Sequence, residues 1–96
     1  MKESKFQHDL IIDIKTRFPG AFIMKTDPRY IQGIPDLMVL WNNRWAMLEC
    51  KTTKTAHRQP NQEYYVDLLN RMSFSMVVYP ENKEEVLDAM ERSFKS

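Results

Sequence analysis

The spacing of apolar residues divides the chain into three helical and four extended segments. Over residues 3–17, apolar side chains recur at three- and four-residue steps, which predicts an amphipathic helix closed by Pro19-Gly20. A second helix is expected from residue 59 or 60 to 72, with an apolar stripe made of Tyr65, Leu68, Leu69 and Met72. A third is expected after Asn82, which can cap it, with a buried side made of Val86, Leu87, Met90 and Phe94.

Short apolar runs at 21–24, 37–41, 44–51 and 74–79 predict β-strands. Asn42-Asn43 separates the second and third runs and favours a tight hairpin turn. The third run alternates, so that one face carries Ala46, Leu48 and Cys50 and the other carries Trp45, Met47, Glu49 and Lys51. The sequence therefore predicts an α/β fold of order αβββαβα, in which a small mixed sheet has the hairpin at its centre and helices on its flanks.

Composition adds limits rather than a function. With 96 residues the chain allows one modest domain, 1–96, and its 43% apolar and 28% charged residues are typical of a globular protein. The net charge of +1 does not by itself indicate a nucleic-acid binder. The single cysteine excludes an internal disulfide and fits a reducing compartment. Because residues 1–10 are mostly polar and no long apolar run follows, we expect no signal peptide, no membrane association and a cytoplasmic location.

Three charged residues stand at the ends of the two hairpin strands. A turn at Asn42-Asn43 pairs residue i with residue 85 − i, which sets Asp36 opposite Glu49, with Lys51 on the face of Glu49. Facing carboxylates repel, and a hard cation such as Mg²⁺ or Mn²⁺ would compensate because it prefers oxygen ligands. A surface salt bridge at a sheet edge is the alternative. Two charges on an otherwise apolar hairpin should cost stability unless they line a cleft, and this argues against the salt bridge.

These residues also carry a family resemblance. Gly33-Ile34-Pro35-Asp36 followed by Glu49-Cys50-Lys51 resembles the PD-(D/E)XK nuclease signature, and the order of elements is similar to the restriction-endonuclease-like αβββαβ core with a C-terminal helix. Within that superfamily the chain is most similar to the small phage and bacterial VRR-NUC domains, and more loosely to Holliday-junction resolvases. Gln62, at the start of the following helix, matches a glutamine of VRR-NUC domains. The resemblance extends from about residue 3 to residue 81.

The resemblance implies a role for each of these residues. Asp36, Glu49 and the backbone carbonyl of Cys50 would bind Mg²⁺ or Mn²⁺, and no small-molecule cofactor is expected. Lys51 would orient or activate water and stabilise charge on the phosphorus, and Gln62 would hold the water or a phosphate oxygen. The implied activity is hydrolysis of DNA phosphodiester bonds by a metal-dependent endonuclease, leaving a 5′-phosphate.

Two residues allow two interpretations each. Glu3 is either a further metal ligand on the first helix, as the family often has, or a solvated residue ahead of a helix that begins with a Ser4-x-x-Gln7 capping box. Cys50 is either a nucleophile or a core residue. We interpret it as core, because a buried free cysteine behaves as a small hydrophobe and a protease would need an adjacent histidine.

Basic and aromatic residues near the expected site are candidates for DNA contact. Lys and Arg neutralise phosphates, and tyrosine can stack on an unpaired base, so we expect contacts from Lys25, Arg29, Tyr30, Lys54, His57 and Arg58. Symmetrical cutting of two strands by so small a domain favours a homodimer. Branched DNA such as a Holliday junction is the substrate that the resemblance implies, in a bacterial or phage-infected cell. A catalytically silent nucleic-acid-binding module and an RNA-cleaving nuclease remain the alternatives.

Overall fold

The computed structural model describes residues 1–96, and its elements follow the predicted order. The helices are α1 (Glu3–Arg17), α2 (Pro60–Met72) and α3 (Lys83–Lys95), with a short 3₁₀ turn, η1 (Pro80–Asn82), before α3. The strands are β1 (Phe22–Lys25), β2 (Leu37–Trp41), β3 (Arg44–Cys50) and β4 (Ser75–Val78). The predicted αβββαβα order of an α/β fold is therefore confirmed.

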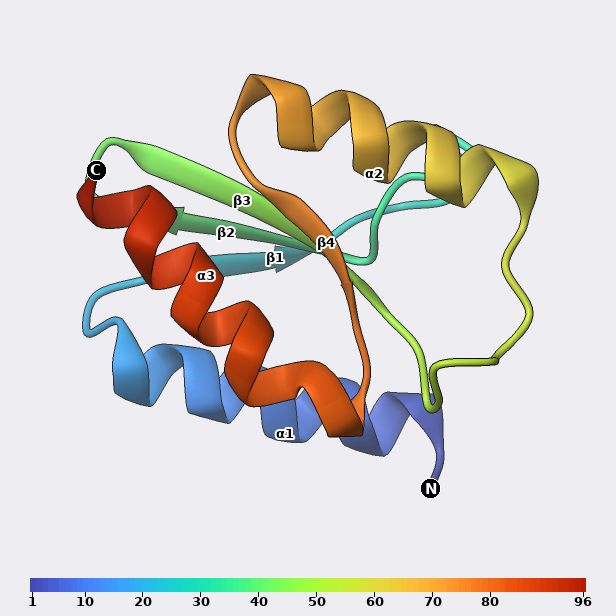
Figure 1. The fold of residues 1–96 in the computed structure, drawn as a ribbon, viewed down its shortest axis with the longest axis horizontal. Coiled ribbons are helices and arrows are strands. Elements are labelled where there is room, and N and C mark those ends of the chain that lie inside the picture. Colours follow the sequence, from blue (N-terminus) through green and yellow to red (C-terminus); the bar gives the residue numbers. More distant parts are fainter.

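The four strands form one mixed sheet between two helical layers. The strand order is β1-β2-β3-β4, with β3 and β4 parallel and the other pairs antiparallel. Helices α1 and α3 lie together on one face, while α2 crosses the other face over β3 and β4 (Figure 1). The main core lies under α1 and α3, where it includes Leu10, Ile14, Leu48, Val86 and Met90. None of the helices combines the length and the apolar character needed to cross a membrane.

The central hairpin has the predicted register. Leu37 lies opposite Leu48 and Trp41 opposite Arg44, so paired residue numbers sum to 85. Asn42 makes the turn possible because it adopts a left-handed backbone conformation, with φ of 57°, which asparagine tolerates better than most residues. This register determines which residues face each other at the end of the hairpin away from the turn.

Three local predictions are corrected. The first strand begins at Phe22, one residue later than expected. On α2 the buried residue is Val66, whereas Met72 is 65% exposed, so the helix presents a slightly different face to the sheet. Asn82 stands at the N-cap position of α3 but does not cap it. Its side-chain oxygen accepts the Tyr79 N–H and its amide donates to the Val77 carbonyl.

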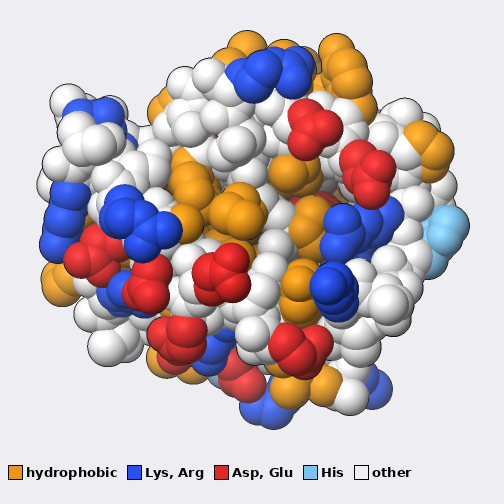
Figure 2. Space-filling view, in the orientation of Figure 1, with side chains coloured by type: hydrophobic (Ala, Val, Ile, Leu, Met, Phe, Trp, Pro, Cys, Tyr) orange, Lys and Arg blue, Asp and Glu red, His pale blue; other side chains and the backbone are white.

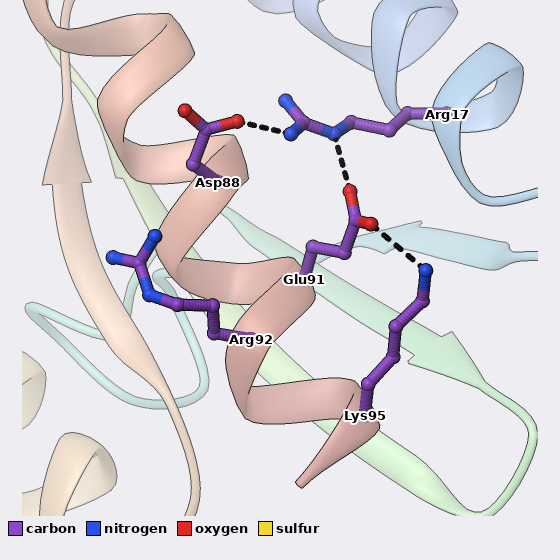
Figure 3. A pocket seen from close by; sticks show the side chains of 5 residues that line it. All are labelled: Arg17, Asp88, Glu91, Arg92 and Lys95. Carbon is purple, nitrogen blue, oxygen red and sulfur yellow. Dashed lines mark hydrogen bonds and ion pairs between the residues drawn. The ribbon is translucent and has the colours of Figure 1, made fainter.

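A cluster of ion pairs joins α1 to α3 on the surface. The Arg17 guanidinium donates to Asp88 and, at 2.9 Å, to Glu91, and Lys95 also binds Glu91 (Figure 3). Every carboxylate drawn in the pocket between these helices already has a basic partner. The cluster therefore holds the two helices of one layer in register rather than offering an open binding site.

Candidate metal-binding and phosphodiester site

The Asp36 carboxylate lies where β2 and β3 stop pairing. The backbone of Asp36 still pairs with the first strand, since the Thr26 N–H donates to the Asp36 carbonyl at 2.9 Å. The Pro35 carbonyl instead accepts the Thr26 hydroxyl at 2.7 Å. Opposite, the Cys50 N–H donates to Asp36 Oδ2 at 2.9 Å, so the aspartate side chain serves as the acceptor at the end of the ladder. This contact fixes the carboxylate beside the last residues of β3.

Glu49 is a buried carboxylate on a strand that is otherwise apolar around it. Its relative exposure is 1%, which excludes the surface salt bridge that its spacing alone allowed. Oε2 accepts the Gln62 side-chain amide at 2.8 Å and lies 3.3 Å from Lys51 Nζ. Oε1 is buried and has no hydrogen-bond partner. An unpartnered buried carboxylate oxygen is costly, and it marks a position where a ligand would lower the free energy.

The two carboxylates oppose each other's ionisation. Burial, reinforced by the charge of Asp36, raises the pKa of Glu49 from 4.5 to about 7, although Lys51 acts in the opposite direction. Burial also raises the pKa of Asp36, against the Cys50 N–H and the Lys51 charge. One lysine therefore does not compensate the buried Glu49 and the half-buried Asp36, and a second cation would.

Gln62 connects this site to the beginning of α2. Its Oε1 accepts the Gln59 N–H at 3.0 Å while its amide binds Glu49, so one side chain both caps the helix and holds the carboxylate. The capping role was not predicted from the sequence. Only the Gln62 half of Gln59-Pro60-x-Gln62 matches a capping box, because Gln59 is not one of the usual N-cap residues.

Gly33 was also not predicted to be a packing residue. A Cβ there would lie 2.4 Å from Asn61 Cβ, so the loop before β2 fits against α2 only as glycine.

Cys50 is a core residue, as interpreted. Its side chain is fully buried, beside Gln7 of α1, and burial raises the pKa of the thiol, which makes a thiolate nucleophile unfavourable. Because the N–H and C=O groups of a strand residue share one side, the Cys50 carbonyl faces the same side of β3 as the N–H that donates to Asp36. Its role as an oxygen ligand stays a prediction.

Glu3 lies near the site without joining it. Helix α1 begins at Glu3 with Lys2 as N-cap, and no side-chain cap forms, so the Ser4-x-x-Gln7 capping box is wrong. Glu3 is exposed, yet its charge adds to the rise in the pKa of Glu49. No three acidic, histidine or cysteine side chains are clustered closely enough to form a metal site by themselves. The role of Glu3 as a ligand stays a prediction.

The residues present fit one hard divalent cation. They supply Glu49 Oε1, which is otherwise unpartnered, the second oxygen of Asp36 and the Cys50 carbonyl, and Mg²⁺ commonly completes such a partial set with water. The fit rests on the orphaned carboxylate oxygen and on the raised pKa values of both acids. A cation there would give Glu49 Oε1 a partner and would lower the pKa of both acids.

The candidate DNA-contact residues divide into two loops. Arg29 and Tyr30 project from the loop before β2, with Tyr30 86% exposed and Arg29 paired to Asp27 at 3.0 Å, and Lys25 is exposed at the end of β1. In the loop before α2, Lys54 and His57 are exposed. On the face shown in Figure 2, Lys and Arg side chains occur in several places and are mixed with acidic groups rather than collected in one basic patch.

Arg58 points elsewhere. It binds the Lys54 carbonyl, lies 3.9 Å from Glu63, and lines a surface groove of about 360 Å³ between α2 and the outer side of β4. The structure therefore does not bring Arg58 to the carboxylates, whereas Tyr30, Lys54 and His57 are exposed and Arg29, although exposed, is paired with Asp27.

Comparison with known proteins adds no relationship to this geometry. No protein-family model, curated protein or solved structure matches the chain.

Proposed function

We propose that the protein is a divalent-metal-dependent endonuclease that hydrolyses DNA phosphodiester bonds. The observation that carries the proposal is the buried Glu49 carboxylate, which lies across the hairpin from Asp36 with one oxygen unpartnered and the other bound by Lys51 and Gln62. Two acids and a carbonyl can bind a divalent metal, and a lysine beside them can stabilise charge on a phosphoryl group, which matches the site that the resemblance implies.

Each side chain has a task that follows from its contacts. Asp36, Glu49 and the Cys50 carbonyl would hold Mg²⁺ or Mn²⁺, which when bound polarises a phosphoryl oxygen and lowers the pKa of bound water. Lys51, whose side chain is 12% exposed, can reach from Glu49 to a phosphate oxygen and stabilise the charge that develops there. Gln62 holds Glu49 in place from the helix side and is thereby a positioning residue.

The substrate proposal combines the resemblance with the exposed loops. Branched DNA, such as a Holliday junction, is the proposed substrate, and cleavage would leave a 5′-phosphate. The exposed Arg29, Tyr30, Lys54 and His57 support contacts with a phosphate backbone and an unpaired base. A homodimer would supply one site for each strand. The free cysteine supports a reducing compartment such as the cytoplasm of a bacterial or phage-infected cell.

Two other functions compete with this one. A catalytically silent nucleic-acid-binding module would need no neighbouring carboxylates at its binding surface, because carboxylates repel phosphates, so Glu49 and Asp36 argue against it. An RNA-cleaving nuclease would use the same donor set. The substrate panel below therefore includes RNA.

Cleavage assays with matched variants test the proposal. Purified protein is incubated with linear, nicked, flap and four-way DNA and with RNA, each with Mg²⁺, with Mn²⁺ or with EDTA. We expect metal-dependent cutting of branched DNA, abolished by Lys51→Met and unaffected by Lys15→Met, which removes an exposed lysine from α1. Cleavage of RNA alone would support the second alternative. Binding without any cleavage would support the silent module, and equal cutting by Lys51→Met would reject the assigned site.

A further inference from the structure

The two edges of the sheet differ in how their backbone groups are satisfied. On β4 the outward-facing residues are 75, 77 and 79, because the Phe74 and Val78 carbonyls accept bonds from β3. Asn70 accepts the Ser75 N–H at 3.0 Å, and Asn82 binds the Tyr79 N–H and the Val77 carbonyl at 2.8 and 3.1 Å. Side chains thus occupy this edge and block the pairing of another strand.

The β1 edge has no such protection. The Thr26 N–H bond to the Asp36 carbonyl shows that residues 22, 24 and 26 face β2, so Ile23 and Lys25 turn their backbone groups outwards. No backbone or side-chain hydrogen bond reaches these two N–H and two C=O groups. Phe22 and Met24 on the same strand are 61% and 41% exposed. An open edge with exposed apolar side chains is a ready template for strand pairing.

We infer that β1 pairs antiparallel with β1 of a second copy, about a two-fold axis at Met24, in a symmetrical dimer. This register places Ile23 opposite Lys25 of the second copy. Each free N–H and C=O of these two residues then bonds to a free group on the other copy. The same strand supplies matching donors and acceptors, so the edge is self-complementary. Met24 then meets Met24 of the second copy, and its exposed apolar surface is covered.

Neighbouring registers fit less well. Centring the pair on Lys25 would set two lysines directly opposite each other, which is unfavourable. Centring it on Ile23 would require the Ala21 N–H to donate to the second copy, but this group already donates to the Phe18 carbonyl at 2.9 Å. The Met24-centred register avoids both conflicts.

The dimer would join two sheets into one without covering either site. An axis that relates paired antiparallel strands runs perpendicular to the sheet, so both copies present Asp36 and Glu49 on the same face. One DNA molecule lying on that face would meet two sites. This dimer gives the homodimer of the proposed function a specific interface. It depends only on the hydrogen bonding of β1, and its test needs no nuclease activity, so the dimer and the nuclease activity can each fail without the other.

Register-specific cross-linking tests the inference. In the proposed dimer Met24 and its copy form a non-hydrogen-bonded pair with Cα atoms about 4.5 Å apart, within the range of a disulfide. The two Phe22 residues would be four residues apart along the strands, about 13 Å, which is too far. We therefore expect Met24→Cys to form a covalent dimer on mild oxidation, while Phe22→Cys does not. The wild type, whose only cysteine is buried, serves as the control.

Light scattering completes the test. The wild type should show a mass twice the 11.5 kDa of the chain at high concentration. A monomer at the highest soluble concentration, together with no cross-linking of Met24→Cys, would overturn the inference. A dimer in which Phe22→Cys cross-links, or in which Met24→Cys does not, would show another register or surface and would overturn it as well.

Discussion

Replacing Glu49 by glutamine should stabilise the metal-free protein at high pH and have little effect at low pH. The variant keeps the shape of the side chain and an oxygen to accept from Gln62, but it removes the buried charge. Because the folded state raises the pKa of Glu49 from 4.5 to about 7, the folded protein binds this proton more tightly than the unfolded chain does.

The sign and size of the effect on the free energy of unfolding follow from this difference in pKa. Below pH 4.5 the carboxyl is protonated in both states and contributes nothing. As the pH rises from 4.5 to about 7, the unfolded chain ionises first, and stability falls by about 1.4 kcal/mol per pH unit. The total is about 3 kcal/mol, a large part of the stability of a small domain. Above pH 7 the loss is complete and constant.

Urea unfolding in EDTA at about pH 4 and about pH 8 measures the effect. The difference in unfolding free energy between Glu49→Gln and wild type should grow by about 3 kcal/mol from the lower to the higher pH. Glu85→Gln, an exposed change on α3, is the matched control and should show no such growth. Adding Mg²⁺ at pH 8 should stabilise wild type more than Glu49→Gln. The same difference at both pH values would refute the reasoning, because Glu49 would then ionise as it does in water.

Three further substitutions test how the site is supported. Gly33→Ala should destabilise by about 1–3 kcal/mol and by more than Gly20→Ala, because both have positive φ but only Gly33 contacts α2; equal losses in chemical denaturation would contradict the packing role. Asn82→Ala should cost about 1–3 kcal/mol, since it leaves two backbone groups of the β4 edge without partners, and unchanged stability would exclude this edge role. Arg17→Ala should lower the melting temperature at low salt, and the difference from wild type should shrink near 1 M salt, where charges are screened; a salt-independent loss would indicate packing instead.

The sequence predicts the fold well where short-range rules decide it. A two-residue turn at Asn42-Asn43 leaves one hairpin register, and that register sets Asp36 across from Glu49. The helix over 3–17 has the observed bounds because Pro19-Gly20 follows its apolar stripe directly. Local patterns and the tertiary structure agree at these points.

Other features depend on contacts between distant segments. Val66, rather than the predicted Met72, lies on the buried side of α2. Which side is buried depends on how the helix is rotated over β3 and β4, and the spacing of its apolar residues fixes that rotation only to within part of a turn. Asn82 follows a capping pattern, yet it binds β4 because the edge of the sheet offers unpaired groups nearby. The burial of Glu49 could not be predicted from the sequence pattern either, because the spacing alone also allowed a surface salt bridge.

A count of bound Mn²⁺ tests whether Asp36 and Glu49 form a metal site. Electron paramagnetic resonance of free Mn²⁺, titrated into the protein near pH 8, reports how much metal each chain takes up. We expect one saturable site per chain in wild type and in Glu85→Gln, and loss of that site in Asp36→Asn, whose side chain can still accept the Cys50 N–H. No saturable binding by the wild type, or equal binding by Asp36→Asn, would contradict the claim that Asp36 and Glu49 hold a divalent cation.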